Sequence, residues 1–130
     1  MDLAAERRNG DFVRGLIRSG RIRVCHDLSD GGLLAAAAEM ALASNVGVEL
    51  NATSDLHAHA YLFGEDQGRY LIACPADEAE ELLAEAQAAG VHAIRAGVAG
   101  GDGFGSGGVF EVSLAALRDA NEGWLPRFMA

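Results

Sequence analysis

The sequence predicts an α/β (α+β) fold in which helices cover a mixed β-sheet, and three observations lead to this prediction. Helical and strand-like apolar patterns follow each other in the order helix, strand, helix, strand, helix, strand, helix, strand, strand, helix. Half of the 130 residues are hydrophobic, which is enough for a globular core. The formal net charge is −9, and no run approaches the roughly 18 apolar residues that a membrane span needs. We therefore expect a single globular domain over residues 1–130, with no affinity for nucleic acid or membranes.

The first half of the chain is predicted to hold three helices and two strands. In chain order these are a helix over 9–19, a strand over 21–25, a helix over 31–44, a strand over 48–51 and a helix over 56–61. The first helix begins either near residue 9 or already near Leu3, although Gly10 weakens the earlier start. The polar residues 53–55 are expected to cap the short third helix.

The second half is predicted to hold three strands and two helices. They are a strand over 69–74, a helix between Pro75 and Gly90, strands over 91–98 and 109–112, and a helix that begins at Leu114 after a Ser113 cap. The apolar strand over 69–74 is expected to be buried on both faces. The glycine-rich stretch 97–108 lacks the lysine of a phosphate-binding P-loop, and we interpret it as a long, mobile hairpin connection.

The end of the chain carries an apolar tail made of Trp124, Leu125 and Phe128. Two interpretations remain open for it. The tail either folds back onto its own domain or forms a patch that meets another domain.

One polar stretch breaks a buried strand just before an alanine-rich helix, and it contains Asp27, Ser29, Asp30, Gly31 and Gly32. The first turn of a helix offers unpaired N–H groups and the positive end of the helix dipole, which together attract anions. Glycines allow a ligand to approach the backbone, and carboxylates suggest a cation at the same place. The competing interpretation is that Ser29 or Asp30 caps the helix and that the glycines form a turn.

A second polar stretch, Glu65-Asp66-Gln67, stands directly before the apolar strand at 69–74. Polar side chains at a sheet end are typical of ligand sites in α/β folds. The triplet is equally compatible with an ordinary acidic loop.

The remaining metal-ligating residue types give no sign of a metal site. The two cysteines, Cys25 and Cys74, end strand-like runs without a CxxC motif, so we expect buried, reduced thiols of a cytosolic protein. His57 and His59 are two residues apart on a predicted helix, so they should face different directions on the surface. The glutamates of the helix after Pro75 are expected to form a solvated face.

The two polar motifs, in this order and at this separation, resemble those of a known family. The first resembles the signature of the C-terminal domain in the aminoimidazole ribonucleotide synthetase superfamily and reads His26-Asp27-Leu28-Ser29-Asp30-Gly31-Gly32-Leu33. Within this superfamily, the phosphoribosylformylglycinamidine synthase family is the most similar. Its likeness lies in Gly64-Glu65-Asp66-Gln67-Gly68-Arg69-Tyr70 and in the tail over 117–126, and it extends from about residue 9 to residue 128.

The resemblance implies an ATP-dependent carbon–nitrogen ligase of purine biosynthesis, which uses Mg²⁺ and takes ammonia from glutamine. ATP phosphorylates the amide oxygen of formylglycinamide ribonucleotide, and ammonia then displaces phosphate to give the amidine. By motif match, Asp27 takes the role of the Mg²⁺ ligand. The residues expected near a ligand are Ser29, Asp30, Gly31, Gly32, Glu65, Asp66 and Gln67. No residue is assigned a catalytic role, because this half of the pseudo-symmetric synthetase is expected to hold a degenerate nucleotide site.

The resemblance also implies partners. We expect the N-terminal domains of the same synthetase chain, a glutaminase subunit and a small accessory subunit, all in the cytoplasm. The chain alone should be inactive, and it should self-associate through surfaces that those domains would cover. Two alternatives stay open: the equivalent domain of another superfamily member, such as aminoimidazole ribonucleotide synthetase, and a purely structural or oligomerisation domain.

Overall fold

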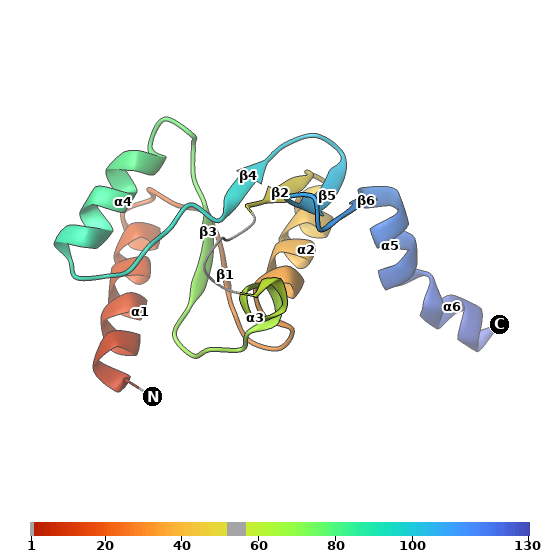
Figure 1. Cartoon of the computed structure of the whole chain (residues 1–130), viewed down its shortest axis with the longest axis horizontal. Helices are drawn as coiled ribbons and strands as arrows, with labels where there is room; N and C mark the ends of the chain where they lie inside the picture. The colour runs from red at the N-terminus through yellow and green to blue at the C-terminus, as the bar shows by residue number, and fades with distance from the viewer. Residues whose placement is uncertain (1, 52–56) are drawn as a thin grey trace. The chain divides into compact units, whose positions relative to one another are not determined.

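The computed structural model describes residues 2–51 and 57–130, and over these residues it has the predicted α/β character (Figure 1). The described helices are α1 Leu3–Arg18, α2 Gly32–Ser44, α3 Ala58–Phe63, α4 Ala79–Ala88, α5 Leu114–Glu122 and α6 Trp124–Met129. The described strands are β1 Val24–Asp27, β2 Val48–Leu50, β3 Tyr70–Ala73, β4 Gly97–Ala99, β5 Gly103–Ser106 and β6 Phe110–Ser113. The cap predicted at 53–55 lies outside the described residues.

The described residues form two compact units, and the chain passes between them within α2, within α3 and between residues 95 and 96. The first unit comprises residues 2–36 and 62–95, and the second comprises 37–51, 57–61 and 96–130. Instead of one sheet, each unit has its own: β1 pairs with β3 in the first, and the second has the strand order β4-β2-β5-β6. None of the described helices is both long and apolar enough to cross a membrane.

The first unit packs α1 and α4 around a small apolar core. Leu16, Ile22 and Leu82 are buried together, and Phe12, Val13, Cys25, Ile72 and Cys74 pack against them. Helix α1 takes the earlier of the two predicted starts, because the Asp2 carboxylate accepts hydrogen bonds from the N–H groups of Ala4 and Ala5. Strand β3 is only partly buried, so the prediction of burial on both faces is wrong.

The glutamates of α4 keep exposed side chains, as predicted, and two of them also form ion pairs. Nη1 of Arg21 lies 2.7 Å from Oε1 of Glu85, and Nη2 of Arg21 lies 3.6 Å from Oε1 of Glu81. Arg21 therefore links the segment after α1 to α4. The Glu85 hydrogen bond raises the pKa of Arg21, against the opposing effect of burial.

Two predicted strands begin later than expected because backbone hydrogen bonds close the preceding helices. The N–H groups of Arg21 and Ile22 donate to the carbonyl of Leu16, so β1 begins only at Val24. Val91 donates in the same way to Ala86 after α4, and residues 91–96 form no strand before β4 begins at Gly97. The hydrophobic pattern alone does not predict such backbone hydrogen bonds at the C-terminus of a helix.

The glycine-rich stretch 97–108 is not the mobile hairpin connection that we predicted. It contains β4 and β5, and β5 pairs in parallel with β2 and antiparallel with β6. The backbone is closely packed at Gly105, because a Cβ there would lie 2.7 Å from Glu49 Oε2 and 3.0 Å from the Phe110 carbonyl oxygen. Within β5, Phe104 and Ser106 are buried.

Candidate functional site

The two polar motifs come together at the start of α2. The N–H of Gly31 donates a hydrogen bond of 2.9 Å to Oε1 of Glu65, 34 residues further along the chain. Gly32 packs against the same segment, because a Cβ there would lie 2.7 Å from the Gly64 carbonyl oxygen. The structure therefore joins two stretches that the sequence presents separately.

A tight turn leads from β1 into α2, whose first residues Gly32 and Leu33 are buried. Leu28 is buried and its N–H donates to the Arg69 carbonyl, while Gly32 donates to the Ser29 carbonyl. Gly31 and Gly32 have φ values of +80° and +65°, which L-residues with side chains rarely adopt. The glycines of the motif thus serve both the turn and the close approach of the 63–64 backbone.

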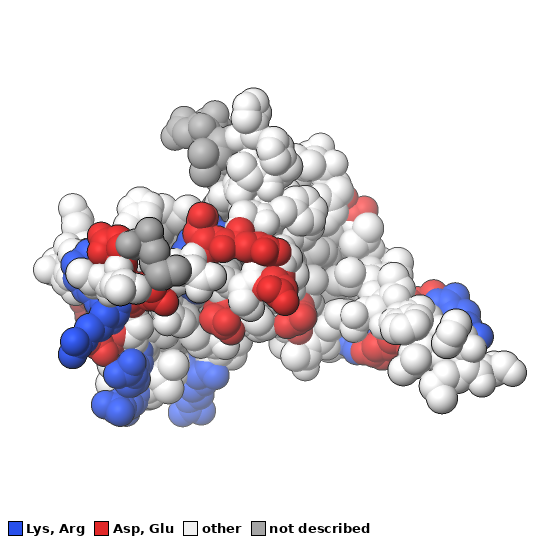
Figure 2. Space-filling model, turned by 90° about the horizontal axis from the view of Figure 1, so that it is seen from below, with Lys and Arg blue, Asp and Glu red and all other residues white. Residues whose placement is uncertain are grey.

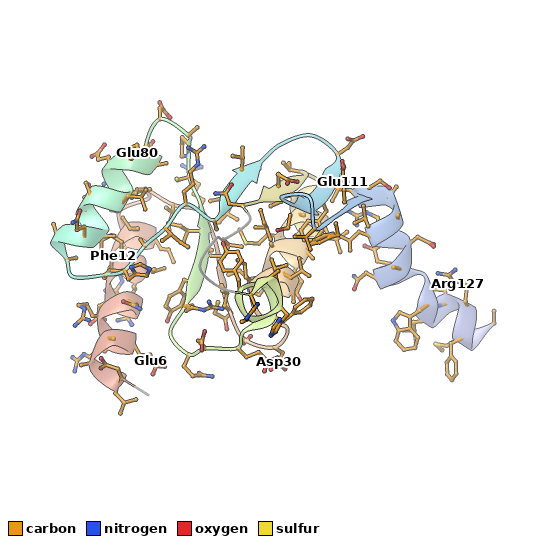
Figure 3. The ribbon with its side chains drawn as sticks, viewed as in Figure 1. Glu6, Phe12, Asp30, Glu80, Glu111 and Arg127 are labelled. Atoms are coloured by element: carbon orange, nitrogen blue, oxygen red, sulfur yellow. The ribbon has the colours of Figure 1, made fainter. Side chains whose placement is uncertain are left out.

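The cap of α2 comes from an unexpected residue. Ser29 and Asp30 are exposed, and neither side chain makes a hydrogen bond to the helix start among the described residues. Asp30 lies in the loop that leads into α2 (Figure 3). The Glu65 carboxylate takes the capping role instead, so the interpretation in which Ser29 or Asp30 caps the helix is wrong.

Arg69 holds the segment that carries Glu65, and sequence reasoning assigned it no role. Its Nη2 donates to the Gly64 carbonyl at 2.8 Å, and its Nη1 lies 3.7 Å from the Asp66 carboxylate. Asn9 of α1 supports the same turn by donating to the Gly68 carbonyl at 3.1 Å. An arginine shortly after a Gly-Glu-Asp-Gln run was the available signal for such a positioning role.

Asp27 ends β1 at the same edge, opposite Tyr70 at the start of β3. Its side chain is 69% exposed and lies 3.8 Å from Nδ1 of His26. No cluster of three or more His, Cys, Asp or Glu residues suited to a metal occurs within 2–51 and 57–130. A lone exposed carboxylate nevertheless fits Mg²⁺, which commonly takes one or two protein carboxylates and completes its shell with phosphate oxygens and water.

Together these residues form an exposed edge rather than an enclosed pocket. Asp66 and Gln67 are exposed beside Glu65, and so are Ser29 and Asp30 beside Gly31. A hollow of about 500 Å³ occurs elsewhere, against α4 and the segment after it, and includes none of the motif residues. The edge therefore offers several carboxylates and the loop before a helix to a ligand, but does not surround one.

Cysteine and histidine side chains lie outside this edge or at its margin. Cys25 and Cys74 are free thiols and only partly buried. Burial raises the pKa of the Cys25 thiol, and the negative charge of Asp27 raises it further. The rings of His57 and His59 do not face different directions but stack, with their centroids 5.7 Å apart. His57 precedes α3, so the helical geometry that would separate the two side chains does not apply to it.

The chain resembles known proteins over its whole length. Residues 1–110 match the family described as AIR synthase related protein, C-terminal domain. All 130 residues align at 65% identity with the phosphoribosylformylglycinamidine synthase subunit PurL of Caulobacter vibrioides, and at 50% identity with that of Parvibaculum lavamentivorans. The chain covers only 17% and 18% of the length of these two relatives.

Solved structures share the fold. Thermotoga maritima PurL complexed with FGAR superimposes with a TM-score of 0.76 at 19% identity, over 86% of this chain and 20% of that one. The complex of T. maritima PurL with ATP gives a TM-score of 0.75 at 18% identity, over 85% of this chain and 21% of that one. A Thermus thermophilus protein gives a TM-score of 0.59 at 27% identity, over 72% of this chain and 34% of its own length.

Proposed function

Because the chain belongs to the family of C-terminal domains of AIR synthase related proteins, we propose that it is the C-terminal domain of a phosphoribosylformylglycinamidine synthase. The identity of 65% over the whole chain to a PurL subunit supports this choice over other members of the superfamily. The domain would then be part of an ATP-dependent carbon–nitrogen ligase with glutamine as amide donor. An amide oxygen leaves poorly, and its phosphorylation makes it a good leaving group for displacement by ammonia.

In this proposal the edge at the start of α2 is one wall of a ligand cleft. The observation that carries it is the hydrogen bond from Gly31 to Glu65, which brings the two motifs of the family together. A phosphate group would bind at the N–H groups of the helix start other than that of Gly31, and Asp66 and Gln67 would contact the polar part of a substrate. Asp27 would hold Mg²⁺, which neutralises phosphate charge when it is bound.

The other wall of the cleft would come from elsewhere. The chain spans about a sixth of the length of the relatives that it matches, so we propose that residues 1–130 act as one domain of a longer synthetase chain. A glutaminase subunit and a small accessory subunit would complete the complex, in the cytoplasm. The free chain would then lack most nucleotide contacts and have no synthetase activity.

A chimera tests this proposal. This chain would replace the matching segment of the Caulobacter vibrioides PurL subunit, and amidine formation would be measured with ATP, Mg²⁺ and ammonia. We expect the chimera to be active and the free chain to be inactive. An inactive chimera that is folded and binds ATP, or amidine formation by the free chain, would contradict the proposal.

A purely structural role is the second candidate, because the Gly31–Glu65 hydrogen bond also serves the packing of the domain without any ligand. The carboxylate of Glu65 already occupies the N–H of Gly31. Titration calorimetry of the free chain with Mg²⁺ and ATP distinguishes the two roles. Binding that Asp27→Asn weakens supports a ligand edge, whereas no binding to either protein supports a structural domain.

A further inference from the structure

Helix α6 presents an apolar surface that nothing within the described chain covers. We name its side chains Trp124, Leu125, Phe128 and Met129 the apolar corner. They are 60%, 47%, 81% and 77% exposed, respectively. The rings of Trp124 and Phe128 pack against each other, with their centroids 6.4 Å apart. Figure 2 shows mostly uncharged surface at this end of the molecule. Contiguous exposed apolar side chains of this size mark interaction sites.

The apolar corner is held in a defined geometry rather than left as a loose end. Nε of Arg127 donates to the Gly123 carbonyl at 2.8 Å, and its Nη2 donates to the Asp119 carbonyl at 3.2 Å. Gly123 leaves no room for a side chain, since a Cβ there would lie 2.5 Å from the Asp119 carbonyl oxygen. A preorganised surface loses less conformational entropy when it binds, which favours an interface.

Helix α5 precedes α6 and is held in place by its own contacts. Leu114 is buried, the Ser113 hydroxyl caps the helix at Ala116, and Nη2 of Arg118 donates to the Leu42 carbonyl at 2.7 Å. Of the two interpretations left open for the tail, the exposed patch therefore fits the structure better than a tail that folds back.

Charge weakens docking between two copies of this chain, so a second copy does not fit as the stable occupant of the apolar corner. Residues 114–130 contain two arginines and two acidic residues, so their formal charges cancel and the whole −9 lies on the rest of the chain. Two copies that dock through the apolar corner would bring two strongly acidic bodies together, which repel each other. A neutral apolar segment instead fits an apolar groove on a different body.

The extent of the matches points to that body. The family match ends at residue 110, whereas the match to the Caulobacter vibrioides PurL subunit includes all 130 residues. The apolar corner therefore lies beyond the match to the shared domain but within the match to a synthetase chain. We propose that the apolar corner docks into an apolar groove on the part of a synthetase chain that lies outside these 130 residues, an inference that rests on the proposed function.

Oxidative footprinting tests this proposal on the active chimera described above. Hydroxyl radicals would label Trp124, Phe128 and Met129 in the free chain, at a dilution where sedimentation shows a monomer, and in the chimera. We expect strong labelling in the free chain and loss of that labelling in the chimera. Phe128→Ala in the chimera should restore labelling at Trp124, whereas Ile94→Ala, at a similarly exposed apolar residue of the first unit, should not.

The outcomes separate this inference from the proposed function. An active chimera whose apolar corner is labelled as strongly as the free chain overturns the inference and leaves the proposed function intact. Protection that appears only when the chimera dimerises identifies a second copy as the occupant, and it also overturns the inference. A folded chimera that binds ATP but is inactive counts against the proposed function, whatever its labelling pattern.

Discussion

At the residue scale, Glu65 supplies the acceptor that the first turn of α2 does not find locally. Replacing it by alanine leaves the N–H of Gly31 without its partner and removes a negative charge from the helix N-terminus. We expect Glu65→Ala to lower the free energy of unfolding by about 1 kcal/mol. The free energy of unfolding of Glu65→Gln should lie between that of Glu65→Ala and that of the unaltered chain. Denaturant unfolding measures the loss, and amide hydrogen exchange should become faster at Gly31.

Glu111 provides the matched control, since it is an exposed glutamate on β6 with no ion pair in the described chain. Glu111→Ala should leave exchange at Gly31 unchanged. Equal exchange at Gly31 in Glu65→Ala and in the unaltered chain would show that the contact does not persist in solution.

Cys25 provides a pH prediction. Burial and the charge of Asp27 raise the pKa of its thiol in the folded chain, so the neutral form is favoured there. In the unfolded chain the thiol ionises near its ordinary pKa of about 8.5. Its contribution to stability is thus fully present below that pH and is lost as the pH rises through the folded pKa.

Alkylation by iodoacetamide measures this shift in a Cys74→Ser variant, in which Cys25 is the remaining thiol. We expect the rate of the folded protein to rise at higher pH than the rate of the same protein in denaturant. Identical pH profiles in the two states would refute the shift.

At the scale of elements, two glycine-to-alanine changes should have opposite signs. Gly15 lies within α1 and a Cβ there meets nothing within 4 Å, so Gly15→Ala should stabilise the protein by about 0.5–1 kcal/mol. Gly97 begins β4, where a Cβ would overlap the Glu49 carbonyl oxygen of β2, so Gly97→Ala should destabilise by about 1–3 kcal/mol. Thermal unfolding of both variants measures the signs, and a stabilising Gly97→Ala would contradict the close β4–β2 packing.

At the scale of the whole molecule, the free chain exposes apolar side chains on a body with a net charge of −9. We expect weak self-association that added salt strengthens, because salt screens the repulsion between acidic copies. Sedimentation velocity measures it, and the double change Trp124→Ala and Phe128→Ala should reduce it while Ile94→Ala should not. A chain that stays monomeric at high concentration and high salt would refute this expectation.

The sequence by itself determined the elements whose signals are local. Apolar periodicity predicted α2 within a residue of its start, and the Ser113 cap was predicted from its residue type. The two motifs also identified the family, because motif spacing is a property of the chain alone. Residues of the candidate edge such as Gly31 and Glu65 were likewise found from their types and positions.

Tertiary structure decided everything that depends on distant partners. It made Glu65 rather than Ser29 the cap of α2, and it turned the glycine-rich stretch into β4 and β5. These outcomes depend on hydrogen bonds between segments up to 58 residues apart, such as that from Gly107 to Glu49, which no local pattern encodes. The reason is physical: periodicity records which face of an element is apolar, whereas a hydrogen bond or a close backbone approach depends on which other segment meets that face.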